Sequence, residues 1–147
     1  MKILFVCTGN TCRSAMAGVL AQHLAQKRGI ANLQCSSAGL AAMPGDRASD
    51  GARAAMRARG LSLEEHQAQR VTKSMLDAAD VVLTMSEAHA AALAPYAGEG
   101  KLFTLCAFAG ESGTVADPYG GSDAVYEACA AQLERLIDKA LTRLYAR

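Results

Sequence analysis

The sequence lacks an excess of charge of either sign. Its 15 basic residues are matched by 14 acidic ones, so the formal net charge is +1 over 147 residues. A nearly neutral chain has no global field that attracts polyanions, so neither nucleic acid nor an anionic membrane surface is an expected partner. The sequence also lacks an apolar run near the ~20 residues that a membrane-spanning helix needs. No membrane segment is therefore expected.

Cysteine and histidine clusters of the kind that bind metals are also missing. The chain has five cysteines, an odd number, and three histidines, none of them spaced as in zinc-binding motifs. The cysteines are scattered along a chain that is too long for a disulfide-stapled miniprotein: Cys7, Cys12, Cys35, Cys106 and Cys129. We therefore expect no metal, no cofactor and a reducing compartment.

Composition and length favour one packed domain. Hydrophobic residues make up 51% of the chain and charged residues 20%, which argues against disorder. The length suits a single compact domain over residues 1–147. The apolar start, residues 1–6, is too short for the apolar segment of a signal peptide. A monomeric cytoplasmic protein is the expectation.

Strand and helix patterns alternate along the chain, which predicts an α/β fold. Strands are predicted over residues 2–6, 33–38, 80–85 and 101–105, and helices over 14–28, 47–59, from 86 to near 95, and 122–145, with a loop at 107–116. This order predicts a four-stranded parallel sheet flanked by helices in three layers. The last helix carries a stripe predicted to pack in the core: Val125, Cys129, Leu133, Leu136, Ile137, Ala140, Leu141 and Leu144.

Residues 7–14, between the first predicted strand and helix, read Cys-Thr-Gly-Asn-Thr-Cys-Arg-Ser. Gly9 permits unusual backbone conformations, so successive N–H groups can turn inward toward an anion. The following helix directs its positive end at the same point. Arg13 can donate two hydrogen bonds to a tetrahedral oxyanion. The loop therefore predicts a phosphate-binding site at the carboxyl ends of the strands.

Cys7 is the candidate nucleophile of this loop. A thiol at a helix N-terminus beside an arginine ionises more readily than a free thiol, so a thiolate is expected near neutral pH. Ser14 can donate its hydroxyl to that sulfur.

The loop lacks the lysine of G-x-x-x-x-G-K-[ST] and the pattern G-x-G-x-x-G, which disfavours an NTPase or a dinucleotide enzyme. The plainer alternative is that Cys7 is a small buried apolar residue and Arg13 a solvated one.

Displacement at phosphorus also needs an acid that protonates the leaving group. Asp117 is the best candidate, because it follows the fourth predicted strand and precedes Pro118, which holds it in an extended conformation. The alternative is that Asp117 only opens a turn. The remaining candidates look like surface or capping residues: Asp46, Asp50, Asp77 and Asp80.

These motifs resemble the low-molecular-weight protein tyrosine phosphatase family over essentially the whole chain. The resemblance rests on residues 5–14 (Phe-Val-Cys-Thr-Gly-Asn-Thr-Cys-Arg-Ser) and 117–119 (Asp-Pro-Tyr). Residues 37–39, 66–72 and 80–85 resemble the intermediate landmarks of the family.

The resemblance implies a two-step reaction through a phosphocysteine, without metal or cofactor. Cys7 would be the nucleophile, Arg13 the phosphate clamp and Asp117 the general acid and base. The substrate would be a phosphorylated protein and the product inorganic phosphate. The resemblance assigns substrate binding to Thr8, Gly9, Asn10, Thr11, Cys12, Ser14 and Tyr119. It assigns support of Asn10 to Ser37 and His66, and makes Cys12 a possible disulfide partner of Cys7.

Some positions depart from the family pattern. Ala15 and Gly18 stand where proline and glutamate are common, and Gly120 replaces a second tyrosine. Thr11 stands where tyrosine-specific members carry isoleucine, which resembles the protein arginine phosphatase branch. A hydroxyl suits a planar phosphoguanidinium, and Tyr119 could stack on a phenyl ring or a guanidinium. Phosphoarginine is therefore slightly favoured over phosphotyrosine.

Two alternatives remain. A thioredoxin-coupled arsenate reductase would share the fold and the loop, but it needs two more cysteines after the third strand. Residues 85–89 hold none, and Cys106 and Cys129 come too late in the chain. A catalytically silent phosphate-binding module is the non-enzymatic alternative.

Overall fold

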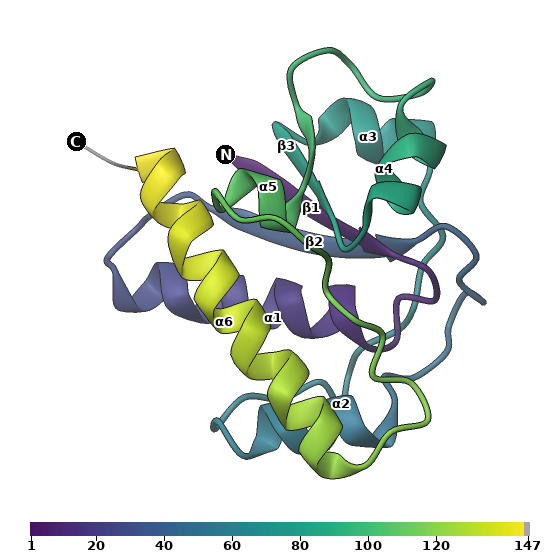
Figure 1. Ribbon diagram of the computed structural model, residues 1–147, viewed down its shortest axis with the longest axis vertical. Coiled ribbons are helices and arrows are strands. Elements are labelled where there is room, and N and C mark those ends of the chain that lie inside the picture. Colours follow the sequence, from purple (N-terminus) through teal and green to yellow (C-terminus); the bar gives the residue numbers. More distant parts are fainter. Residues whose placement is uncertain (146–147) are drawn as a thin grey trace.

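The computed structural model describes residues 1–145, which form a parallel sheet between two layers of helices (Figure 1). The strands are β1 (Lys2–Cys7), β2 (Gln34–Gly39), β3 (Val81–Thr84) and β4 (Leu102–Thr104). They pair in the order β2-β1-β3-β4, and every pairing is parallel. The predicted four-stranded parallel sheet is confirmed.

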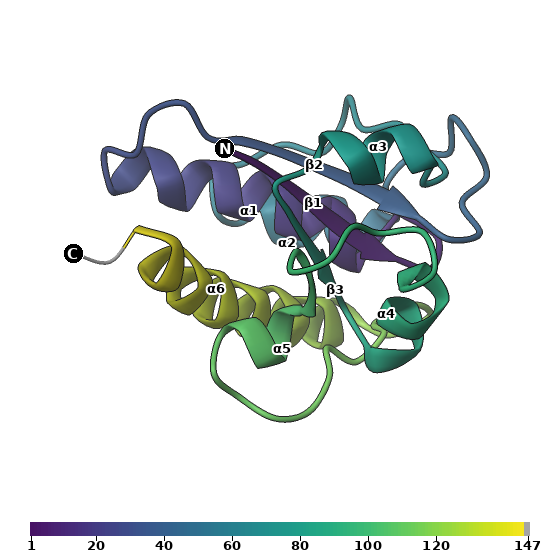
Figure 2. The ribbon, with the colours of Figure 1, turned by 90° about the horizontal axis from the view of Figure 1, so that it is seen from above.

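The helices divide between the two faces of the sheet (Figure 2). They are α1 (Arg13–Lys27), α2 (Asp50–Arg57), α3 (Lys73–Ala78), α4 (Glu87–Leu93), α5 (Leu105–Phe108) and α6 (Asp123–Tyr145). Successive side chains of a strand point to opposite faces. Ile3 and Phe5 of β1 accordingly pack with α1, α2, α5 and α6, whereas Leu4 and Val6 pack with α3 and α4. Within residues 1–145, no helix is long and apolar enough to cross a bilayer.

Two short helices lie where none was predicted. α3 has six residues, of which only Leu76 is buried, so it leaves no apolar periodicity in the sequence. α5 occupies four residues at the end of the fourth predicted strand and the start of the predicted loop. α2 also begins later than expected, because the Ser49 side chain accepts a hydrogen bond from Ala52 N and so caps the helix there.

The core stripe of α6 was predicted wrongly at its first position. Val125 is 46% exposed, whereas Tyr126 is only 5% exposed. Tyr126 lies three, four and seven residues before Cys129, Ala130 and Leu133, all of which are buried, and this spacing defines one helix face. The ring of Tyr126 packs on Gly51, where an added Cβ would lie 2.2 Å from Tyr126 Cδ2. The buried stripe therefore begins at Tyr126, and Leu144 near its end is half-buried.

Candidate active site

The loop at residues 8–12 joins β1 to α1 at the carboxyl edge of the sheet. The residue in the left-handed region is Asn10, with φ 56°, and not Gly9 as the sequence suggested. Asparagine tolerates this conformation better than most residues, because its short side chain makes local hydrogen bonds. The tight turn of the loop is therefore made by Asn10.

Asn10 is fully buried and is held by four polar partners. Its Nδ2 donates to Ser14 Oγ and to Ser37 Oγ, each at 2.9 Å. His66 Nε2 donates to Asn10 O at 2.6 Å, and Gln69 N donates to Asn10 Oδ1 at 2.9 Å. The structure thus brings Ser37 and His66 to Asn10. Gln69 was missed, because a backbone donor leaves no signal in the side-chain pattern.

The thiol of Cys7 lies at the end of β1, buried beneath the loop. Its Sγ is 2.9 Å from Ser14 Oγ. Ser14 Oγ accepts a hydrogen bond from Asn10 Nδ2, and its hydroxyl proton can point at the sulfur or at the Ala38 carbonyl, which is 3.4 Å away. The pair places a hydroxyl group against the sulfur of the predicted nucleophile.

Arg13 is the first residue of α1 and is almost fully buried. Its Nη1 donates to the Val115 carbonyl at 3.0 Å, which fixes the guanidinium. Its Nη2 lies 3.7 Å from Asp117 Oδ2. The guanidinium thus joins the phosphate loop to the segment that carries Asp117.

Asp117 both opens a turn and faces Arg13. Its Oδ1 accepts a hydrogen bond from Tyr119 N at 3.1 Å, while Oδ2 is the oxygen nearest Arg13. The Asp117 side chain is 54% exposed, so it can exchange protons with solvent or a leaving group. Tyr119 is 73% exposed at the rim of the site. Asp117 therefore opens a turn and also faces Arg13, and its role as the acid stays a prediction.

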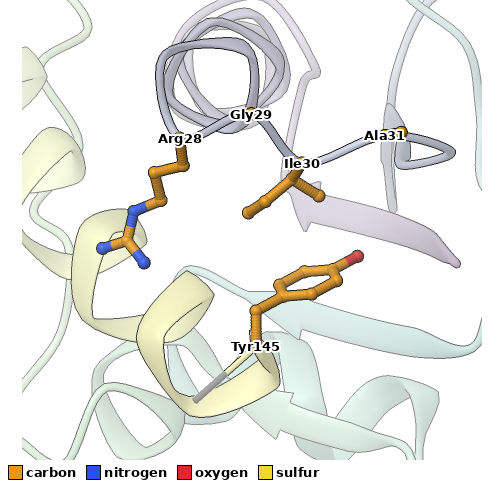
Figure 3. A pocket seen from close by; sticks show the side chains of 5 residues that line it. All are labelled: Arg28, Gly29, Ile30, Ala31 and Tyr145. Atoms are coloured by element: carbon orange, nitrogen blue, oxygen red, sulfur yellow. The ribbon is translucent and has the colours of Figure 1, made fainter. Parts of the chain in front are cut away.

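The side chains of Cys7, Arg13 and Asp117 line one pocket of about 200 Å³. It is lined by Cys7, Thr8, Gly9, Thr11, Cys12, Arg13, Asp117 and Tyr119. The predicted residues Asn10, Ser14, Ser37 and His66 lie outside the lining. A larger cavity, about 530 Å³, lies where the ends of α1 and α6 meet and is lined by residues 28–31 and Tyr145 (Figure 3). It contains none of the candidate residues, so the smaller pocket is the candidate active site.

Cys12, which also lines the pocket, is held by hydroxyl groups from two other elements. Its Sγ lies 3.2 Å from Ser49 Oγ and 3.4 Å from Tyr126 Oη. Burial, followed by the hydrogen bond to Cys12, raises the pKa of Tyr126 to about 12, so its hydroxyl stays protonated. Neither neighbour was predicted, because Ser49 and Tyr126 lie 37 and 114 positions away from Cys12.

His89 is a further residue that the sequence left unassigned. Its Nε2 lies 2.9 Å from Thr8 Oγ1, beside the pocket. Burial, followed by the positive charge of Arg13, lowers the pKa of His89, while the negative charge of Asp117 opposes the shift. The available signal was the spacing Ser-x-x-His directly after the third strand.

The cysteines that a reductase would need lie elsewhere. Residues 85–89 run from the end of β3 into α4 and contain no cysteine. Cys106 is buried in α5 and Cys129 in α6, and neither lines the pocket. Burial raises the pKa of both thiols, that of Cys129 to about 11, which makes them poor nucleophiles at neutral pH. No cluster of His, Cys, Asp and Glu suited to a metal occurs in the described part of the chain.

Known proteins match this chain over nearly its whole length. Residues 2–147 match the family described as low molecular weight phosphotyrosine protein phosphatase. A protein-arginine-phosphatase of Bacillus subtilis is 38% identical over 93% of this chain and 92% of its own length. The low molecular weight protein-tyrosine-phosphatase PtpB of Staphylococcus epidermidis is 37% identical over 95% and 96%. 

A solved structure of YwlE arginine phosphatase, a C7S mutant with a phosphorylated active site serine, superposes with a TM-score of 0.91. It is 35% identical and covers 100% of this chain and 98% of that one. The loop between β1 and α1, the Asp117 segment and these matches agree, and the chain belongs to the low molecular weight phosphotyrosine protein phosphatase family.

Proposed function

We propose that this enzyme removes phosphoryl groups from phosphoarginine in proteins, in two steps through a phosphocysteine. The observation that carries this proposal is the convergence of Cys7, Arg13 and Asp117 on one pocket of about 200 Å³. The three residues come from the end of β1, the start of α1 and the segment before α6. A nucleophile, an anion clamp and an acid are the groups that phosphoryl transfer requires.

In the first step, the Cys7 thiolate attacks phosphorus and the bond from phosphorus to the leaving group breaks. Arg13 and the N–H groups of the loop hold the phosphoryl oxygens as charge shifts among them. Asp117 gives its proton to the leaving nitrogen or oxygen. The free side chain departs and Asp117 is left as a carboxylate.

In the second step, water attacks the phosphocysteine. Asp117 takes a proton from the water as the oxygen bonds to phosphorus, and the bond from sulfur to phosphorus breaks. Cys7 leaves as a thiolate, which the Ser14 hydroxyl stabilises from 2.9 Å. Inorganic phosphate is released and both residues return to their starting states.

Thr11 and the similarity to named relatives support phosphoarginine as the preferred substrate. Thr11 lines the pocket, where its hydroxyl can accept a hydrogen bond from a guanidinium. Two similar curated proteins, 38% and 37% identical to this chain, are named protein-arginine-phosphatase. The exposed ring of Tyr119 at the rim offers a face for cation–π stacking.

Side-by-side turnover on matched peptides tests the preference. Peptides of one sequence carry either phosphoarginine or phosphotyrosine, and released phosphate is measured. We expect a higher kcat/KM for phosphoarginine. A higher value for phosphotyrosine would contradict the preference and leave the two-step reaction standing.

Thr11→Ile tests the residue on which the preference rests. A branched alkyl group removes the acceptor and adds an apolar wall, so the ratio of phosphoarginine to phosphotyrosine kcat/KM should fall by about tenfold. The same two peptides give the measurement, with Thr114→Val as the control, because Thr114 does not line the pocket. An unchanged ratio in Thr11→Ile would show that this side chain does not set the preference.

A monomer in the cytoplasm is proposed as its setting. All five cysteines are free thiols in the structure, as is usual for a reducing compartment. Light scattering on the purified protein checks the monomer, and a dimer mass would contradict it.

A further inference from the structure

Thr8, the residue after the Cys7 nucleophile, is tied to a histidine from another element. Thr8 lines the pocket, and its Oγ1 lies 2.9 Å from Nε2 of His89. The two residues are 81 positions apart in sequence. The mechanism above uses neither side chain.

His89 is fixed on its other side by the residue that caps α4. It is only 6% exposed, and its Nδ1 lies 3.0 Å from Ser86 Oγ. The backbone N–H of His89 also donates to Ser86 Oγ, at 3.3 Å. The buried hydroxyl of Thr84 donates to the Ser86 carbonyl at 2.9 Å, which holds the capping residue in place. Both ring nitrogens of His89 therefore have a hydrogen-bond partner.

Donor and acceptor rules allow an arrangement of protons in this chain of contacts in which the Thr8 hydroxyl points into the pocket. Ser86 Oγ accepts from a backbone N–H, and within residues 1–145 the only acceptor in its reach is His89 Nδ1. If the Ser86 hydroxyl donates to Nδ1, a neutral imidazole carries its proton on Nε2. That N–H then donates to Thr8 Oγ1. The Thr8 hydroxyl proton has no acceptor within the described residues and is free to point into the pocket.

The surroundings of His89 favour the neutral ring that this direction requires. The side chain is buried, and the charged groups that act on it are Arg13 of α1 and Asp117 of the segment before α6. Burial and Arg13 both disfavour a charged imidazole. A protonated ring would donate from both nitrogens, and the Ser86 hydroxyl would have to turn away.

We propose that His89 is a positioning residue that directs the Thr8 hydroxyl into the pocket, where this hydroxyl donates to an oxygen of the bound phosphoryl group. The proposal rests on the phosphatase function of the same pocket. It adds one side-chain donor to the N–H groups of the loop and Arg13. A single hydrogen bond to a charged oxygen changes affinity by about tenfold or more.

Phosphate binding to the purified protein tests the pair. Thr8→Val removes the hydroxyl at constant shape, and His89→Phe removes both ring nitrogens. Each should weaken the Kd for inorganic phosphate by about tenfold in calorimetry. The double variant should be no weaker than Thr8→Val, because both changes remove the same bond. Thr8→Ser, which keeps the hydroxyl, should bind phosphate more tightly than Thr8→Val does.

A matched pair of cap variants separates positioning from helix stability. Ser86→Ala removes the cap of α4, and Thr72→Ala removes the equivalent cap of α3, where Thr72 Oγ1 accepts from Met75 N at 3.2 Å. Both should lower the melting temperature, but only Ser86→Ala should weaken phosphate binding. Equal phosphate affinity in the two cap variants would overturn the proposal.

The tautomer can be read in the wild-type enzyme, which avoids any variant that fails to fold. Imidazole nitrogen-15 shifts should show His89 with Nε2 protonated and Nδ1 bare at pH 7. The opposite tautomer would overturn the proposal, as would wild-type phosphate affinity in Thr8→Val. Neither result would touch the phosphatase function, which fails only if the wild-type enzyme neither binds phosphate nor releases it from phosphopeptides.

Discussion

At the residue scale, the Cys7 sulfur lies beside a hydroxyl that belongs to a network of hydrogen bonds. Ser14 Oγ accepts from the Asn10 amide, and it lies 2.9 Å from the Cys7 sulfur and 3.4 Å from the Ala38 carbonyl, so the sulfur is one of two acceptors for its proton. Asn10 is in turn fixed by Ser37, His66 and Gln69. The surroundings of the nucleophile therefore depend on side chains that do not line the pocket.

Replacing the sulfur tests its role most directly. Cys7→Ser should lower kcat by at least about 10³-fold, because a serine hydroxyl is not ionised near neutral pH. The Kd for inorganic phosphate should stay close to that of the wild type, because Arg13 and the loop N–H groups remain. Turnover and calorimetry give the two values, and Cys35→Ser on β2 is the control thiol outside the pocket. Wild-type turnover in Cys7→Ser would disprove the assignment.

The loss of rate on removal of the Asp117 carboxyl should be larger for a poorer leaving group. Asp117→Ala should slow phosphoarginine and phosphotyrosine peptides by about 10²–10⁴-fold. p-Nitrophenyl phosphate should be affected much less, because p-nitrophenolate leaves without a proton. Initial rates on the three substrates provide the comparison. An equal loss on all of them would argue for a role in binding and against proton transfer.

At the element scale, the phosphate loop is packed against the end of β2. Gly39 ends that strand, and a Cβ added there would lie 2.5 Å from Thr8 O and 2.9 Å from Asn10 N. Both are backbone atoms and cannot move aside without bending the loop. The strand end therefore sets how closely the loop can approach the sheet.

Gly39→Ala should destabilise the protein and disturb the site together. We expect a loss of about 1–3 kcal/mol in the free energy of unfolding, from overpacking, and weaker phosphate binding. Gly18→Ala is the control, since its Cβ would meet nothing nearer than Ser37 Cβ at 3.9 Å. That change lies inside α1 and should stabilise the protein by about 0.5–1 kcal/mol. Urea unfolding measures both, and equal stability of the two variants would contradict the packing at Gly39.

Sequence patterns predicted the elements that have strong periodicity or clear end signals. All four strands and the helices α1, α4 and α6 lie within a few residues of their predicted ranges. α3 was missed because only Leu76 of its six residues is buried, and α5 because four residues are too few to show a helical period. Val125 was misplaced because spacings of four and of three residues before Cys129 both fit one helix face. The packing on Gly51 selects Tyr126, at the spacing of three.

At the scale of the whole molecule, the site depends on contacts between distant parts of the chain. Cys7, Arg13 and Asp117 could be predicted, because each belongs to a local motif with a chemical reason. His89 and Tyr126 could not, because they meet the loop across 81 and 114 positions. Such contacts exist only once the sheet order and the helix layers are known.

Buried His89 also makes the stability of the whole protein depend on pH. Burial and Arg13 lower the pKa of His89 in the folded state, so below about pH 6.5 the unfolded chain binds a proton that the folded protein resists. Stability should therefore fall as pH drops from 7 to 5.5, by at most about 1.4 kcal/mol per pH unit from this group. Hydrogen bonds from arginine side chains lower the pKa values of Glu64, Glu111 and Glu127, so these carboxylates titrate outside this window.

The contribution of His89 is isolated by comparison with a variant. Urea unfolding of wild type and His89→Phe at pH 7 and 5.5 gives four free energies. The wild type should lose more stability between the two pH values than the variant does. An identical loss would mean that His89 titrates alike in the folded and unfolded chains.

The start of α1 differs from the starts of α2, α3, α4 and α5. Those four are each capped by a serine or threonine side chain, whereas Cys12 precedes α1 and makes no such bond. The first turn of α1 also carries no acidic residue. A bound oxyanion would supply both the missing acceptor and the missing negative charge. Product and substrate should therefore act as folding ligands, and a phosphate concentration a hundred times the Kd would add about 2.7 kcal/mol to the stability of the chain.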